Sequence, residues 1–145
     1  MTKMWRRATT TIFAFALVAT AGSALAQRQL PSFRIMMIAD GDSSVLAERQ
    51  AQLKREILEL AKDDVYVEFL EPPVKPDWSL ESSTAALEVA FADRSVDLII
   101  VSGAITGVAA GRMPRLPKPV LIPYAEPKLQ GLPREGNTSG RRNLA

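Results

Sequence analysis

The chain has 145 residues, with 18 basic and 16 acidic side chains, and it contains neither cysteine nor histidine. Without cysteine it has no disulfide, no thiol nucleophile and no lipid-modified N-terminus. Without histidine it lacks the common zinc sites, the Ser-His-Asp triad and imidazole acid–base catalysis. Chemistry that uses carboxylates alone remains open.

The first 26 residues predict a secretory signal peptide. A basic segment precedes an apolar stretch over residues 12–21, and small residues stand at Ala24 and Ala26. This three-part layout is typical of a signal that is cleaved, here after Ala26. An uncleaved membrane anchor is the alternative, but the apolar stretch is shorter than the roughly 20 residues that a membrane-spanning helix needs. We therefore expect a periplasmic protein.

The basic character of the chain belongs to this signal. Lys3, Arg6 and Arg7 are three of the 18 basic residues, so 15 basic and 16 acidic side chains remain after cleavage, a net charge of −1. A nucleic-acid-binding domain needs Lys and Arg clustered on one face. The pair Arg141–Arg142 is expected to lie in a solvated tail, and the sequence predicts no nucleic-acid partner.

The chain after the signal begins with a predicted strand and helix. Residues 33–39 are nearly continuously apolar, which is typical of a strand buried on both faces of a parallel sheet. A turn cluster at residues 40–44 can cap the helix that follows. That helix is predicted over residues 44–62 from four apolar residues at helical spacing. These are Leu46, Leu53, Ile57 and Leu60.

A second strand and a second helix follow. Residues 65–70 are β-branched and aromatic, and Pro72–Pro73 ends this strand. Ser79 is a good cap for a helix whose apolar face runs to Phe91. Trp78, just before the cap, is expected to pack over this second helix.

The last third of the chain predicts two more strands around a short helix. Residues 97–101 form the third strand, residues 104–112 a helix rich in small residues, and residues 120–123 the fourth strand. Residues 126–145 are rich in Gly, Pro and charge and have no apolar period. We interpret them as a tail that follows an α/β lobe over residues 27–125.

The alternation of strands and helices predicts the fold class. The order β-α-β-α-β-α-β with right-handed crossovers gives an α/β domain, a Rossmann-like parallel sheet of about four strands with flanking helices. In such sheets ligands bind beyond the carboxyl ends of the strands. The loops after strands one, three and four are therefore expected to meet there.

These loops supply the candidate ligand-binding residues, which carry hydroxyls, a carboxylate, a ring or room for close approach. The candidates are Asp40, Gly41, Ser43, Ser44, Ser102, Gly103 and Tyr124. A purely structural role is open for several of them, because Ser43 or Ser44 can be a helix cap and Gly103 a turn residue. We predict no catalytic residue, no metal site and no cofactor.

Several segments resemble one family. They are residues 33–61, Asp77–Leu80, residues 96–100, Lys118–Pro123, residues 129–133 and residues 138–144. Together they are similar to the N-terminal lobe of a periplasmic substrate-binding protein of the ABC transporter type, in the branch often encoded beside outer-membrane efflux proteins. The resemblance implies two type I lobes that close over a small molecule and present it to a membrane permease.

The chain departs from this family in length, because family members are much longer. The resemblance therefore implies a truncated N-terminal lobe, with residues 126–145 as the start of the crossover to a missing second lobe. A pocket normally covers about 70–90% of its ligand, which one open lobe does not achieve alone. A second lobe or a permease is thus an expected partner, beside a small-molecule solute.

Three functions compete at this point. The first is a periplasmic solute-binding component without catalysis. The second is a periplasmic interaction or structural protein of an efflux or envelope assembly, whose open cleft packs against another subunit. The third is a carboxylate-only hydrolase or transferase that uses Asp40, Asp42 or Glu126, although no spacing of these residues supports it.

Overall fold

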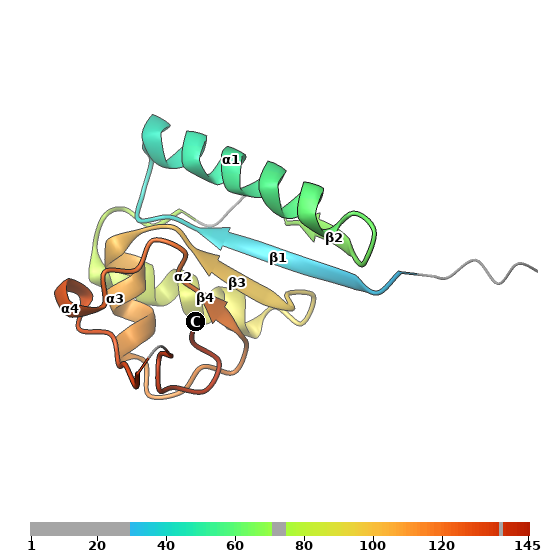
Figure 1. Cartoon of the computed structure of the whole chain (residues 1–145). Helices are drawn as coiled ribbons and strands as arrows, with labels where there is room; N and C mark the ends of the chain where they lie inside the picture. The colour runs from blue at the N-terminus through green and yellow to red at the C-terminus, as the bar shows by residue number, and fades with distance from the viewer. Residues whose placement is uncertain (1–29, 71–74, 137) are drawn as a thin grey trace, which may run out of the picture.

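The computed structural model describes residues 30–70, 75–136 and 138–145 (Figure 1). The predicted signal peptide and Pro72–Pro73 lie outside the described residues. The elements are, in chain order, β1 Ser32–Ile38, α1 Ser44–Ala61, β2 Tyr66–Phe69, α2 Leu80–Ala92, β3 Leu98–Val101, α3 Ala104–Arg112, β4 Val120–Leu121 and α4 Pro127–Gln130.

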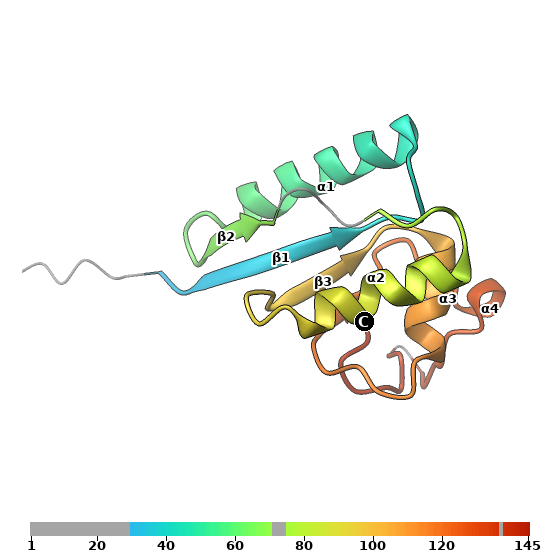
Figure 2. The ribbon, with the colours of Figure 1, turned by 180° about the vertical axis from the view of Figure 1, so that it is seen from behind.

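The four strands form one parallel sheet in the order β2-β1-β3-β4, which confirms the predicted α/β, Rossmann-like fold. The chain moves from β1 to β2 in one direction and then back across β1 to β3 and β4. Right-handed crossovers therefore place α1 on one face and α2 with α3 on the other. The two opposite views of Figures 1 and 2 show this three-layer arrangement.

The main core lies between the sheet and the α2–α3 layer. Met36, Ile38 and Val101 from the central strands pack there against Leu87 of α2 and Ala110 of α3. The α1 side is thinner and has three fully packed residues. They are Ile35, Met37 and Ile100. Because the central strands contribute buried side chains to both faces, they read in the sequence as continuous apolar runs.

Helix α1 packs less deeply than its apolar period predicts. Leu53 and Ile57 lie against the sheet but stay partly exposed, and the only buried residue of this helix is Gln50. Leu60, expected on the buried face, is 83% exposed. That expectation is wrong because the apolar spacing identifies only one side of the helix. A residue on that side is buried only where the sheet extends beneath its turn of the helix.

The tail packs against the lobe. Leu144 is 7% exposed and joins the main core, while Leu132 contacts the same core. The backbone of the last residues bonds to β4. Its N–H and C=O groups pair in three hydrogen bonds, Val120 N to Asn143 O at 2.8 Å, Ala145 N to Val120 O at 2.9 Å and Ile122 N to Ala145 O at 2.7 Å. The tail therefore extends the sheet edge, and a crossover to a second lobe stays a prediction.

The expectation that Arg141 and Arg142 share a solvated tail is wrong for one of them. Arg142 is exposed, but the Arg141 guanidinium donates to carbonyl oxygens at the end of α3. A cation at a helix C-terminus satisfies carbonyls that have no partner within the helix and complements the negative end of the helix dipole.

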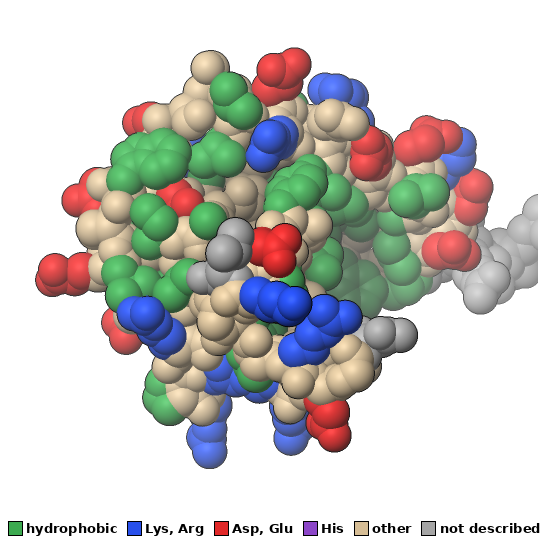
Figure 3. Space-filling view, turned by 60° about the vertical axis from the view of Figure 1, so that its left-hand side comes forward, with side chains coloured by type: hydrophobic (Ala, Val, Ile, Leu, Met, Phe, Trp, Pro, Cys, Tyr) green, Lys and Arg blue, Asp and Glu red, His purple; other side chains and the backbone are tan. Residues whose placement is uncertain are grey.

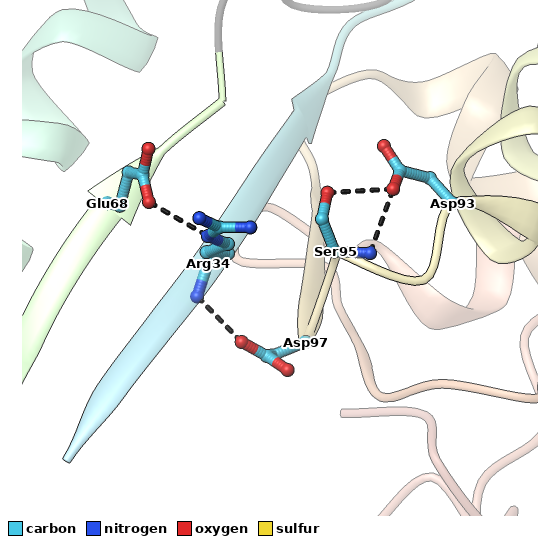
Figure 4. A network of polar contacts seen from close by, with 5 residues as sticks. All are labelled: Arg34, Glu68, Asp93, Ser95 and Asp97. Atoms are coloured by element: carbon cyan, nitrogen blue, oxygen red, sulfur yellow. Dashed lines mark hydrogen bonds and ion pairs between the residues drawn. The ribbon is translucent and has the colours of Figure 1, made fainter.

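The turn between α2 and β3 is fixed by side-chain contacts to Asp93 and Asp97 (Figure 4). Asp93 Oδ1 accepts from the backbone N of Ser95 at 2.8 Å and from its hydroxyl at 2.7 Å. Asp97 Oδ2 accepts from Arg34 N at 2.9 Å, and the Arg34 side chain pairs with Glu68 of β2 at 2.9 Å. The turn is thereby tied to β1 and β2.

Hydrogen bonding changes the acidity of Asp93. The Ser95 hydroxyl, and then the Ser95 backbone N–H, hold the pKa of this carboxyl below its ordinary value. Desolvation opposes this shift, and the charges of Lys118 and Arg34 lower the pKa further.

Within residues 30–70, 75–136 and 138–145, none of the helices combines the length and the hydrophobicity that crossing a membrane requires.

The packed tail predicts the result of two leucine truncations. Leu144→Ala should lower the free energy of unfolding in urea by about 2–3 kcal/mol, because it removes buried methyl groups and leaves a cavity. The matched variant Leu60→Ala, at the 83% exposed position, should change it by less than about 0.5 kcal/mol. Equal effects of the two variants would contradict the tail's place in the core.

The Asp93 contact predicts a dependence on pH. A lowered folded pKa means that the Ser95 contact stabilises the fold above the unfolded pKa and that this stabilisation is lost as pH falls through the folded pKa. Ser95→Ala should therefore lower the free energy of unfolding at pH 7. The difference in this free energy between the variant and wild type should become smaller below about pH 4. Thr84→Ala, which removes a hydroxyl bonded to Leu80 O, is the control and should show no such narrowing.

Candidate functional site

A pocket of about 340 Å³ lies at the carboxyl ends of the central strands, where the sequence predicts it. Its walls come from the loops after β1, β3 and β4, from the first turns of α1 and from the segment before α2. The lining residues are Asp40, Ser43, Val45, Leu46, Arg49, Trp78, Val101, Ser102, Gly103, Ala104, Ile122 and Tyr124.

The pocket brings together five of the seven predicted residues. They are Asp40, Ser43, Ser102, Gly103 and Tyr124. Gly41 is buried, and its Cα faces the indole of Trp78. Ser44 is the exposed first residue of α1 and does not line the pocket.

Asp40 joins the end of β1 to the start of α3. Its carboxylate is buried and accepts from Ile105 N at 3.0 Å, Thr106 N at 2.7 Å and the Thr106 hydroxyl at 2.9 Å. The cap residue of α3 is Gly103, which has no side chain to serve these amides. Asp40 thus satisfies the helix start from another strand, and its negative charge meets the positive end of the helix dipole.

Gly103 is required by this contact. A Cβ atom at that position would lie 2.0 Å from Asp40 Oδ1, far inside contact distance. The glycine therefore serves close approach of a carboxylate to the helix start rather than a turn with positive φ.

Trp78 forms one wall of the pocket in a strained backbone conformation. Its φ is +67°, its N–H donates to Asp40 O at 2.7 Å, and its ring is half exposed. A Cβ on Gly41 would lie 2.3 Å from the indole Nε1, so only glycine lets the ring lie there. The expectation that Trp78 packs over the second helix is wrong, since it lies over Gly41. A left-handed aromatic residue costs conformational energy and is typical of functional sites.

The two hydroxyls of the pocket already have structural partners. Ser43 is the cap of α1 and accepts from Leu46 N at 3.4 Å, which confirms the cap interpretation. Ser102 Oγ accepts from Gln50 Nε2 at 2.9 Å and donates toward Ile38 O at 3.4 Å. The Ser102–Gln50 pair explains why a polar residue is the buried one on α1.

Arg49 lines the pocket although the loop-based prediction did not name it. It lies two turns into α1 and reaches the pocket from the helix, with its guanidinium carbon 5.9 Å from the centre of the half-exposed Tyr124 ring. Among the residues that the structure describes, Arg49 forms no ion pair. Its spacing from Val45 and Leu46, which also line the pocket, puts it on the same side of α1, but no local signal in the sequence marks that side as facing a pocket.

The carboxylates proposed for a hydrolase or transferase do not converge in the pocket. Asp42 has a 90% exposed side chain that pairs with Lys75 at 3.2 Å. Glu126 is the exposed cap residue of α4 and does not line the pocket. In the described part of the chain, no three acidic side chains lie close enough together to hold a metal ion.

The comparisons with known proteins give no relative: no protein-family model, no curated protein and no solved structure is significantly similar to the chain.

The role of Asp40 predicts a large effect of a small change. Asp40→Asn keeps the size of the side chain but replaces an acceptor oxygen by a donor that faces the α3 amides. It should lower the free energy of unfolding by about 2 kcal/mol in urea titrations. Asp42→Asn, with its exposed side chain, is the matched control and should change it by less than about 0.5 kcal/mol. Equal stability of the two variants would contradict the assigned contact.

Proposed function

We propose that the chain is a small-solute-binding module: the N-terminal lobe of a periplasmic substrate-binding protein of an ABC transport system, without catalytic activity of its own. The observation that carries this proposal is the pocket at the carboxyl ends of the strands, which gathers a free guanidinium, two half-exposed rings and an apolar floor. Pockets of this kind, largely apolar with a few polar groups, are typical of small-molecule sites.

The chemistry of the pocket favours a solute that has an anionic group and an apolar part. The Arg49 guanidinium is exposed, without an ion pair among the described residues, and its forked donors suit a carboxylate or a similar anion. Trp78 and Tyr124 offer ring surface, and Val101 and Ile122 are apolar. The helix start of α3 does not add attraction for an anion, because Asp40 already occupies it.

The size and openness of the pocket agree with one lobe of a larger site. Its volume of about 340 Å³ is near the lower end of the roughly 300–1,000 Å³ range of ligand sites. Trp78 and Tyr124 are each 50% exposed, so the outer side of the pocket is not sealed. A second lobe or a partner subunit would supply the missing cover.

One observation favours the alternative, an interaction or structural protein of an efflux or envelope assembly. Phe33, Leu58 and Leu60 are 45%, 45% and 83% exposed, and Phe33 shares the thinly covered α1 side of the sheet with Ile35 and Met37. Exposed apolar side chains of this kind are available for a protein contact.

Thermal unfolding against a panel of small solutes tests the binding proposal. A ligand that binds only the folded chain raises the midpoint by mass action. We expect small carboxylates with an apolar part to raise it and cations of the same size to leave it unchanged. Arg49→Gln should weaken that binding by about tenfold or more, as the loss of a charge-assisted hydrogen bond does.

The matched control is Arg55→Gln, an exposed arginine on the same helix that does not line the pocket. It should bind as wild type does. A panel in which no anionic solute moves the midpoint, or an Arg49→Gln variant with wild-type affinity, would contradict the proposal. Dimerisation that depends on concentration, without any response to solutes, would favour the interaction protein instead.

A further inference from the structure

A second hollow lies at the opposite, amino-terminal edge of the sheet. Helix α3 ends there, and the loop that follows leads into β4, so this edge is remote from the solute pocket. The hollow has a volume of about 390 Å³. Its polar lining consists of Arg115, Arg141, Arg142 and Asn143, and prolines and Leu116 form the rest.

The backbone around this hollow is fixed by contacts between the loop and the tail. Leu116 is 5% exposed and anchors the loop in the core. Asn143 has a φ of +64°, donates from Nδ2 to Leu116 O at 2.8 Å and accepts from Val120 N at 2.8 Å. A site whose backbone is held in this way loses little conformational entropy when a ligand binds.

The cations around the hollow divide into two groups. Arg141 donates to Ala110 O, Gly111 O and Met113 O, and the nearby Lys118 donates to Ala90 O and Asp93 O at the end of α2. These two charges therefore serve helix ends.

Arg115 and Arg142 form the second group. Both are exposed, and neither has an ion pair among residues 30–70, 75–136 and 138–145. No carboxylate lines the hollow. On the face that Figure 3 shows, Lys and Arg side chains gather in the lower half.

We propose that this hollow binds a phosphate group through Arg115 and Arg142. A guanidinium has parallel N–H donors that can bind two oxygens of one phosphate. Arg115 on the loop and Arg142 on the tail also supply two positive charges to balance the negative charge of the phosphate. The phosphate belongs either to a free solute or to a phospholipid head group. The site is independent of the solute pocket, so either proposal can fail while the other holds.

Titration of the full chain with inorganic phosphate, followed by amide chemical shifts, tests the free ligand. We expect shifts of the Arg115 and Leu116 amides and of the amides of residues 141–143, with an affinity that falls about tenfold or more in the double variant Arg115→Gln/Arg142→Gln. The matched control is Arg55→Gln/Arg94→Gln, which removes the same charge from two exposed positions elsewhere and should bind as wild type does. Thermal midpoints of both variants check that the fold is kept.

Co-sedimentation with vesicles distinguishes the two sources of phosphate. Binding to phosphatidylglycerol vesicles, but not to phosphatidylcholine vesicles, that is lost in the double variant indicates a head group. Phosphate binding without vesicle binding indicates a free solute. The proposal is overturned if neither ligand binds, or if the control variant loses as much affinity as Arg115→Gln/Arg142→Gln does.

Discussion

The carboxylate of Asp40 joins the end of β1 to the start of α3, and the pocket at the carboxyl ends of the strands depends on this contact. Gly103 lets the carboxylate approach the helix, and Gly41 leaves room for the ring of Trp78. The N–H of Trp78 donates to the backbone oxygen of Asp40. Asp40 therefore sets both the position of a helix and a wall of the pocket, with Gly103 making room for its carboxylate and Gly41 making room for the ring of Trp78.

This contact also decides which groups are left for a ligand. In many parallel α/β sheets a helix start at the carboxyl edge attracts anions, but here Asp40 satisfies it. The positive charge of the pocket comes instead from Arg49, beside Tyr124. The two edges of the sheet thus carry different groups. At the carboxyl edge the Arg49 guanidinium lies in a pocket with two aromatic rings, and at the amino edge Arg115 and Arg142 line the second hollow.

The fold was predictable because its signals are local. Each element is marked in the sequence itself by an apolar strand pattern, a cap residue or a proline. Because ligands bind beyond the carboxyl ends of parallel strands, the loops there were expected to meet, and Ser43, Ser102 and Tyr124 do line one pocket. Arg49 was missed because a charged helix residue has no local signal for the pocket it reaches. Leu144 was missed because its burial comes from pairing with Val120 of β4, 24 residues earlier in the chain.

Amide hydrogen exchange of the native chain tests the Asp40 contact most directly. Amides in the first turn of a helix have no partner within the helix and exchange rapidly unless another group accepts their hydrogen bonds. We expect the amides of Ile105 and Thr106 to be protected nearly as strongly as Ile100 in β3. Exchange of both amides at the rate of unstructured peptide would contradict the contact and the pocket built on it.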